Sequence, residues 1–239
     1  MSVAVLIDGT FFLKRHRSLY GSKTPQEVAK DLYTIALKHV TYVKHGENPK
    51  TNSVSDLYRI FYYDAPPLGV DGDRTQNPIS KEHIVFNKTD EYKFRVAFLS
   101  ELKKKRKVAL RMGRLSTSGW KFKTSETVKD ICTGKKTVTD LTVADIEFSI
   151  NQKGVDMKIG LDIASLAYKK LVSTIILIAG DSDFVPAAKL ARREGVDFIL
   201  DPMRANNITD DLFEHIDGLK TFSPSNQNKA GSRRNSRRR

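Results

Sequence analysis

The sequence predicts an α/β fold in which a central parallel sheet is flanked by helices on both faces. Short aliphatic runs of strand length alternate along the chain with longer segments whose apolar residues recur at helical spacing. The strand-like runs are apolar throughout, which is typical of strands buried on both faces. Parallel strands need crossover connections, and the intervening helical segments supply them.

The first half of the chain supplies two strands and one well-marked helix. Val3 to Ile7 is a β-branched and aliphatic run that ends at Asp8-Gly9-Thr10, which predicts a buried strand followed by a turn. Thr24 to Glu27 offers an N-cap, a proline at the first helical position and a glutamate that completes a capping box, so a helix begins there. Leu57 to Tyr63 is rich in aromatic residues and predicts the second strand, which stops at Asp64.

The middle of the chain is more basic and less regular. Residues 66–78 predict a loop, and Glu91 to Lys104 predicts a helix. Residues 108–115 and 120–123 are interpreted as a strand and a short partner joined by a turn at 116–119. The segment near 103–136 as a whole is expected to be basic and irregular.

The last third returns to clear alternation. Apolar residues at helical spacing predict a helix over 157–171, and Thr174 to Ala179 predicts a strong buried strand. Residues 184–194 are expected to form a helix that ends at Gly195, and one further strand follows over 196–200. One domain is therefore expected over residues 1–222, and residues 223–239, which hold no large apolar side chain, are expected to form a disordered basic tail.

The composition indicates a nucleic-acid partner. The formal net charge is +13, so the molecule attracts polyanions. Cys132 is the only cysteine, which excludes an intramolecular disulfide and a zinc-finger cage. Asp8 interrupts the apolar N-terminus before a signal-peptide core or a membrane span is complete, so no membrane partner and a cytoplasmic location are expected. The sequence leaves the oligomeric state open.

Four aspartates fall where strands or helices begin or end. Asp8 follows the first strand, Asp156 precedes a helix, and Asp181 and Asp183 follow the strongest strand. The carboxyl edge of a parallel sheet gathers such ends in one crevice. Several carboxylates packed together repel one another unless a cation neutralises them, and oxygen ligands favour Mg²⁺ or Mn²⁺. Each aspartate alone has a simpler explanation as a helix cap or turn residue, but four at such positions predict a metal site for phosphodiester hydrolysis.

The motifs around these aspartates resemble the NYN domain family. They are Leu6-Ile7-Asp8-Gly9, Lys153-Gly154-Val155-Asp156 with Asp162 in the following helix, and Ile178 to Phe184. The resemblance extends over nearly the whole chain up to Phe222, and it implies a PIN-like, Rossmannoid fold and a metal-dependent ribonuclease. It also implies that Asp8, Asp156, Asp181 and Asp183 are the metal-binding and catalytic residues.

One departure from the family pattern concerns the residues beside the metal ligands. NYN domains commonly carry an asparagine shortly after the first Asp-Gly, where this chain has Thr10. Thr10 is therefore expected to supply the polar contact of that asparagine beside the metal ligands. The resemblance also implies that Asp162 and Ser182 lie next to the ligands without binding the metal themselves. Substrate choice stays open, including RNA against DNA, single strand against structured RNA, and endonuclease against exonuclease.

Positive charge outside the acidic crevice is expected to bind the nucleic-acid backbone, and Trp120, rather than Phe122, is expected to stack on a base. The candidate nucleic-acid-binding residues are Lys103, Lys104, Lys105, Arg106, Lys107, Arg111, Arg114, Trp120, Lys121, Lys123, Arg233, Arg234, Arg237, Arg238 and Arg239.

Two other functions compete with the nuclease. A phosphatase of the haloacid-dehalogenase type needs an acid two residues after its aspartate nucleophile, and Thr10 stands at that position relative to Asp8. A non-catalytic RNA-binding module is the second alternative, and retention of all four aspartates argues against it, since bare carboxylates repel phosphates.

Overall fold

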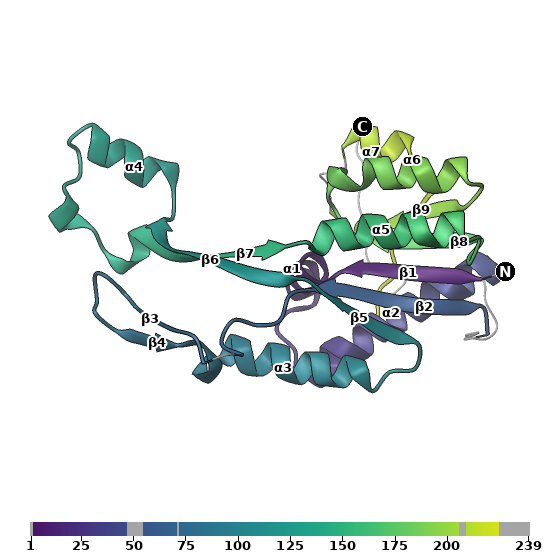
Figure 1. Ribbon diagram of the computed structural model, residues 1–239, viewed down its shortest axis with the longest axis horizontal. Helices are drawn as coiled ribbons and strands as arrows, with labels where there is room; N and C mark the ends of the chain where they lie inside the picture. The colour runs from purple at the N-terminus through teal and green to yellow at the C-terminus, as the bar shows by residue number, and fades with distance from the viewer. Residues whose placement is uncertain (1, 47–54, 71, 206–208, 225–239) are drawn as a thin grey trace, which may run out of the picture.

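A six-stranded parallel sheet forms the centre of the molecule (Figure 1). The computed structural model describes residues 2–46, 55–70, 72–205 and 209–224. The strands of this sheet are β1 (Val3–Asp8), β2 (Leu57–Asp64), β5 (Val108–Met112), β8 (Thr174–Ile178), β9 (Asp197–Asp201) and β10 (Gly218–Leu219). Each neighbouring pair is parallel, so the predicted fold class is confirmed.

The strand order places a switch point in the middle of the sheet. The order is β10-β9-β8-β1-β2-β5, so the chain first builds outward from β1 through β2 to β5. It then returns to the other side of β1 and builds outward again through β8, β9 and β10. Ligands of open α/β sheets bind outside the carboxyl ends of the strands where the order reverses, which here is between β1 and β8.

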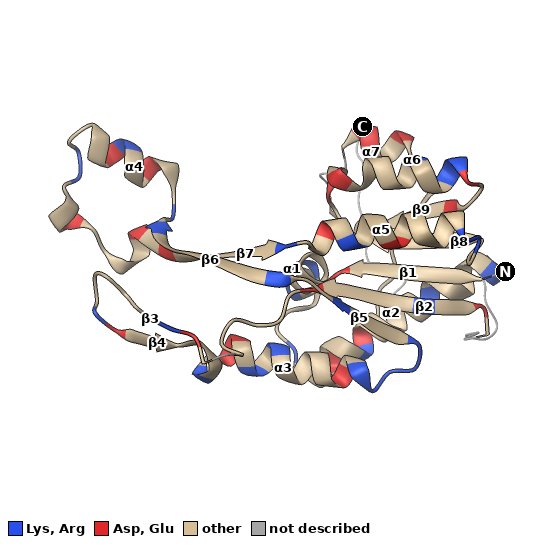
Figure 2. Cartoon of the chain, viewed as in Figure 1, with Lys and Arg blue, Asp and Glu red and all other residues tan. Residues whose placement is uncertain are grey.

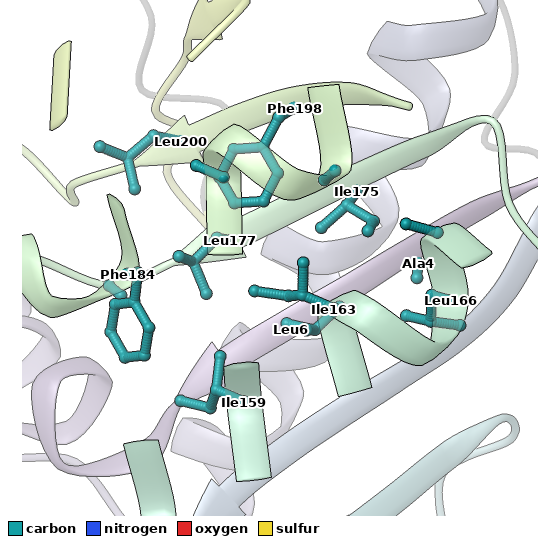
Figure 3. Packing of buried hydrophobic residues seen from close by; sticks show 14 of the residues in the cluster. Ala4, Leu6, Ile159, Ile163, Leu166, Ile175, Leu177, Phe184, Phe198 and Leu200 are labelled. Carbon is teal, nitrogen blue, oxygen red and sulfur yellow. The ribbon is translucent and has the colours of Figure 1, made fainter. Parts of the chain in front are cut away.

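Helices cover both faces of the sheet because alternate strand residues point to opposite sides. Ala4 and Leu6 of β1 pack on one face against Ile159 and Ile163 of α5 (Figure 3). The odd-numbered residues of β1 pack on the other face against the first three helices. The helices of the two layers are α5 (Val155–Tyr168), α6 (Val185–Arg193) and α7 (Asp210–Glu214) on the first face, and α1 (Gly9–Tyr20), α2 (Pro25–His45) and α3 (Asp90–Lys103) on the second.

The helix starts follow the capping rules, with two corrections. α2 begins at the predicted capping box, in which Thr24 Oγ1 accepts from the Glu27 N–H and the Glu27 carboxylate accepts from the Thr24 N–H. The turn expected at Asp8-Gly9-Thr10 is instead the first turn of α1, with Asp8 as its N-cap. Asp156 likewise lies inside the first turn of α5 rather than before the helix.

The segment expected to be irregular holds regular structure, because Ser116 to Gly119 continue a strand instead of forming a turn. β6 (Arg114–Phe122) pairs with the unpredicted strand β7 (Ile146–Lys153) in a long antiparallel ribbon, and a β-bulge near Gly119 absorbs the irregularity. Helix α4 (Ser125–Cys132) and the 3-10 helices η2 (Val138–Asp140) and η3 (Val143–Asp145) cap its far end. We call residues 114–153 the arm.

The arm projects beyond the carboxyl ends of the sheet strands (Figure 1). A second hairpin, β3 (Arg74–Gln76) with β4 (His83–Val85), lies beside it, and η1 (Phe86–Lys88) leads from that hairpin towards α3. Trp120 Nε1 donates to Thr75 Oγ1 at 3.2 Å, and the Phe86 and Phe148 rings lie 5.3 Å apart, so the two hairpins pack together. The expected tail is described only at Ser223 and Pro224, and the remainder of it lies outside the described residues.

Candidate metal and nucleic-acid site

Asp8 occupies the end of β1 at the switch point. Its side chain accepts a hydrogen bond from the Phe11 N–H at 3.1 Å, as an N-cap does. The pKa of this carboxyl is raised from 3.8 to about 6, mainly by burial and also by the nearby carboxylates of Asp156 and Asp64, while hydrogen bonds from the N–H groups of Phe11 and Thr10 oppose the rise. The neighbouring charges that raise the pKa of Asp8, those of Asp156 and Asp64, are both negative, and a site with this charge distribution favours a bound cation.

Asp156 faces the same edge from the first turn of α5. Its side chain is exposed, and the pKa of its carboxyl is raised by partial burial and then by the charges of Asp181 and Asp183. Because Asp8 responds to Asp156, and Asp156 responds to Asp181 and Asp183, the four aspartates form one electrostatic cluster. We call these four residues the acidic edge.

Asp181 and Asp183 flank Ser182 in the connection from β8 to α6. The Asp181 carboxylate accepts a hydrogen bond from the Asp183 N–H at 3.1 Å and caps η4 (Ser182–Phe184). Both aspartate side chains are exposed, so the second carboxylate oxygen of Asp181 and the carboxylate of Asp183 are accessible to a ligand. The Ser182 side chain is also exposed. One carboxylate of the pair serves local structure, as the capping geometry requires, and the other is left for a ligand.

Asp64 is a fifth carboxylate at this edge that the sequence interpretation treated only as the end of a strand. It is 1% exposed and accepts four hydrogen bonds, from Tyr62 Oη, the Ala65 N–H, Arg95 and Gln152. The Arg95 guanidinium lies 2.5 Å from it, so the charge of Asp64 is neutralised within the protein. The same signal that marked Asp8, an aspartate directly after a buried strand, also marks Asp64.

Asp162 makes its carboxylate contacts with the sheet. It lies further along α5, where its carboxylate accepts from Tyr63 Oη at 2.9 Å and pairs with Arg111 Nε at 3.0 Å. These contacts tie α5 to β2 and β5. The geometry therefore gives Asp162 a packing role, and the expectation that it lies beside the metal ligands finds no support in its contacts.

The donor set at the acidic edge fits a hard divalent cation. It consists of carboxylate oxygens, which Mg²⁺ and Mn²⁺ prefer, and burial together with the charges of neighbouring aspartates raises the pKa of Asp8 and of Asp156, an effect that a bound cation would oppose. Among the described residues, no three Asp, Glu, His or Cys side chains stand close enough to enclose a metal by themselves. Mg²⁺ commonly binds one or two carboxylates and keeps waters or substrate phosphates as its other ligands, so an open edge of this kind suits it better than a closed cage would.

Thr10 stands where many NYN domains have asparagine, in the first turn of α1. Its hydroxyl oxygen is buried and has no hydrogen-bond partner among the residues that the structure describes. A buried polar atom without a partner costs about 1–3 kcal/mol, so a ligand that satisfies it gains affinity. That Thr10 lies beside the metal ligands stays a prediction.

The basic run at the end of α3 lies at the opposite end of the sheet (Figure 2). Lys107 precedes the first residue of β5, and its carbonyl accepts from the Ile60 N–H, whereas Asp64 ends β2 four residues further on. At about 3.3 Å per residue this separates the run from the acidic edge by roughly 13 Å or more. Residues Lys103, Lys104, Lys105, Arg106 and Lys107 therefore face away from the proposed chemistry, and their contact with nucleic acid stays a prediction.

The other predicted nucleic-acid contacts have mixed surroundings. Arg111 is engaged by Asp162 and lies over the Phe61 ring, and Lys121 pairs with Glu147. Arg114 and Lys123 are exposed on the arm. The candidates in the tail, Arg233, Arg234, Arg237, Arg238 and Arg239, lie outside the described residues.

The expectation for the two arm aromatics is reversed by their contacts. The Trp120 ring packs edge-on against Phe148 at 5.6 Å while its N–H is held by Thr75, so it joins the two hairpins. Phe122 is 41% exposed. Of the two rings, Phe122 is the more accessible to a base.

A family model of the NYN domain matches residues 70–217. The chain belongs to the NYN domain family. The match covers more than half of the chain and includes Asp156, Asp181 and Asp183, and the resemblance noted from the sequence motifs is confirmed. The α/β fold described above is that of a PIN-like NYN domain.

Comparison with individual proteins adds little to the family assignment. No curated protein matches this NYN domain. A crystal structure of a protein of unknown function from Vibrio parahaemolyticus aligns with 91% of this chain and 90% of its own, at 13% identity and a TM-score of 0.41. In the described part of the chain, no helix has both the length and the apolar character that a membrane crossing requires.

Proposed function

We propose that this NYN domain is a metal-dependent ribonuclease that hydrolyses RNA phosphodiester bonds at the acidic edge. The observation that carries the proposal is the electrostatic cluster of Asp8, Asp156, Asp181 and Asp183 at the switch point of the sheet. Carboxylates held together without a cation repel a phosphate, whereas carboxylates that bind a cation attract one. The net charge of +13 supplies the wider field that draws RNA to the molecule.

Asp8 and Asp156 would hold the divalent cation, and the nearby negative charges of Asp181 and Asp183 would favour it without enclosing it. A cation bound there supplies a water of lowered pKa and neutralises charge on the phosphate. The chain itself fixes the geometry, because the N-cap bond from the Phe11 N–H orients Asp8 and the first turn of α5 orients Asp156.

Asp64 and Arg95 serve this site without binding the cation. The four hydrogen bonds to Asp64 hold the end of β2, the first turns of α3 and the base of the arm at fixed positions around Asp8. The Arg95 guanidinium balances the Asp64 charge, so Asp64 does not add an unpaired carboxylate to the four of the acidic edge. This framework keeps the ligands from rearranging when RNA arrives.

The test is cleavage of single-stranded and stem-loop RNA with Mg²⁺ or Mn²⁺, and with EDTA. Asp156→Asn and Asp181→Asn are each expected to abolish cleavage and to leave the circular dichroism spectrum unchanged, because the amide keeps the shape and loses the charge. Asp162→Asn is a matched control on the same helix as Asp156, and it is expected to retain cleavage. Cleavage that survives exhaustive chelation, or that persists in Asp156→Asn, contradicts the proposal. RNA binding without cleavage under all of these conditions would identify a binding module instead.

A further inference from the structure

Two clefts adjoin each other at the first turn of α1. One, of about 540 Å³, lies between α1, the start of α2 and the start of α3. The other, of about 600 Å³, lies between the start of α3, the segment after β2 and the base of the arm. Thr10, Glu91 and Arg95 line both clefts, so the two are adjacent, and we call the pair the groove. The first cleft is the α1 side of the groove, and the second is the arm side.

The α1 side presents two uncompensated cations. Lys14 and Arg17 lie one helical turn apart on α1, both are exposed, and neither forms an ion pair in the part of the chain that the structure describes. Lys23, the second lysine in this cleft, is instead held by Asp31 at 2.6 Å. Two free cations on one helix face, three residues apart, suit successive phosphates of a polynucleotide backbone.

The arm side presents apolar and aromatic surface with a few amides. Tyr92 and Phe86 are half-buried with faces in the cleft, and Ile150 is 45% exposed. Asn151, also in the cleft wall, is exposed and carries both donor and acceptor atoms for a base edge. Stacking on aromatic rings with hydrogen bonds to base edges is the usual way in which unpaired bases are held.

The middle of the groove lies beside Asp8. Thr10, with its buried and unpartnered hydroxyl among the described residues, follows Asp8 by two residues, and the Arg95 guanidinium reaches Asp64 from the groove wall. None of the four aspartates of the acidic edge lines either cleft, and the groove approaches that edge at Asp8, through Thr10 in the first turn of α1.

We propose that this groove binds one single strand of RNA, with its phosphates over Lys14 and Arg17 and its unpaired bases against Tyr92 and the base of the arm. The inference rests on the proposed function, since it names the form of RNA that the acidic edge receives. The arm side of the groove can bind only unpaired bases. A paired helix presents phosphates to the α1 side but keeps its bases stacked and inaccessible.

Binding by the full chain to a fluorescein-labelled oligouridylate tests this inference. The measurement is made in EDTA on Asp156→Asn protein, so that no cleavage occurs. The Lys14→Gln/Arg17→Gln double variant is expected to bind more weakly and to flatten the log–log salt slope by about 1.4, at about 0.7 for each phosphate that is no longer neutralised. Tyr92→Ala is expected to weaken binding by about tenfold or more because the stacking ring is removed, whereas Tyr92→Phe keeps the ring and the affinity.

Matched controls separate the groove from general charge and exposed rings. Lys103→Gln/Arg106→Gln removes the same charge from the opposite end of the sheet, and Tyr168→Ala removes a 60% exposed ring from α5. Both are expected to weaken oligouridylate binding less than the groove variants do. A duplex RNA of equal length is expected to bind more weakly than the single strand and to be insensitive to Tyr92→Ala.

The proposed binding groove would be contradicted if the Lys14→Gln/Arg17→Gln and Lys103→Gln/Arg106→Gln variants lost oligouridylate affinity equally. Equal affinity of the protein for duplex and single-stranded RNA would contradict it as well. These outcomes are independent of catalysis. Wild-type protein that cleaves RNA while the groove variants bind normally keeps the proposed function and discards the groove. Wild-type protein that never cleaves while the groove variants bind the single strand poorly keeps the groove and discards the nuclease.

Discussion

Gly9 and Gly160 are both helical glycines, but they differ in the space around them. A Cβ added at Gly9 would lie 2.5 Å from the Tyr62 ring and hydroxyl and 2.7 Å from the Tyr63 carbonyl oxygen. A Cβ added at Gly160 would meet nothing within 4 Å. The absence of a side chain at Gly9 lets α1 begin directly against β2, and this close approach sets the position of Asp8.

We therefore expect Gly9→Ala to lower the free energy of unfolding by about 1–3 kcal/mol, because Tyr62 or the backbone has to move. Gly160→Ala is the matched control and is expected to raise it by about 0.5–1 kcal/mol, since alanine stabilises a helix interior. Urea denaturation followed by circular dichroism measures both. Destabilisation of similar size in both variants would show that the close approach at Gly9 is not the cause.

Asp8 makes stability depend on pH. Its pKa is about 6 in the folded chain against an ordinary 3.8, so its ionised form is disfavoured by folding. The resulting destabilisation is absent below about pH 3.8, where the carboxyl is protonated in both states, and is complete above about pH 6.

We expect Asp8→Asn to be more stable than the wild type in EDTA at about pH 7.5, by at most about 3 kcal/mol. Asparagine keeps the N-cap of α1 and carries no charge. The difference in melting temperature between the two proteins is expected to shrink as the pH falls to about 4. A difference that is the same at both pH values would mean that the Asp8 charge is not the source.

The arm is the element that stands apart from the sheet. The two hydrophobic clusters of the core, as far as the structure describes them, contain no residue between Gly113 and Gly154. The far end of the arm is held by local contacts, such as Lys136 with Asp145 and the Lys123 N–H with the Asp145 carbonyl. The base of the arm, by contrast, is anchored to Asp64 through Gln152.

We expect replacement of residues 123–145 by an Asn-Gly turn to leave the core intact. Phe122 pairs with Ile146, so a two-residue turn closes the shortened hairpin. The free energy of unfolding is expected to change by no more than about 1 kcal/mol in urea denaturation. A decrease of several kcal/mol, or the absence of a cooperative transition, would show that the far end of the arm is part of the core.

Positive charge is spread over the molecule well beyond the acidic edge. The net charge is +13, and the residues after Pro224 add five arginines and one lysine without an acidic residue. Such a segment attracts RNA phosphates whatever its conformation, since the attraction needs only charge within a Debye length.

We expect truncation after Pro224 to lower RNA affinity and to flatten its salt dependence by about 0.7 in log–log slope for each phosphate that the tail neutralises. The cleavage rate at saturating RNA is expected to be unchanged, because the acidic edge is retained. Titration of labelled RNA at several salt concentrations measures the first effect and single-turnover cleavage the second. An unchanged affinity and salt slope would assign no RNA contact to the tail.

The fold class and the acidic residues can be predicted from the amino-acid sequence alone. Buried strands such as Thr174–Ile178 and the capping box at Thr24 are local features, visible in a few consecutive residues. The NYN motifs around Asp8, Asp156 and Asp181 depend equally on short segments. Local propensity and spacing are sufficient for such features, because they do not depend on which distant segment lies nearby.

Which of these features meet in space depends on the tertiary structure. Ser116 to Gly119 has the composition of a turn and becomes a strand because β7, about 30 residues later, pairs with it. Asp162 matches the family pattern, yet Tyr63 and Arg111 bind its carboxylate, while Asp64 lies at the acidic edge because it ends β2. The basic run at Lys103 to Lys107 falls at the far end of the sheet, and Lys14 and Arg17 line a cleft together with Thr10 and Arg95, because strand direction and order, rather than sequence distance, set which charges are neighbours.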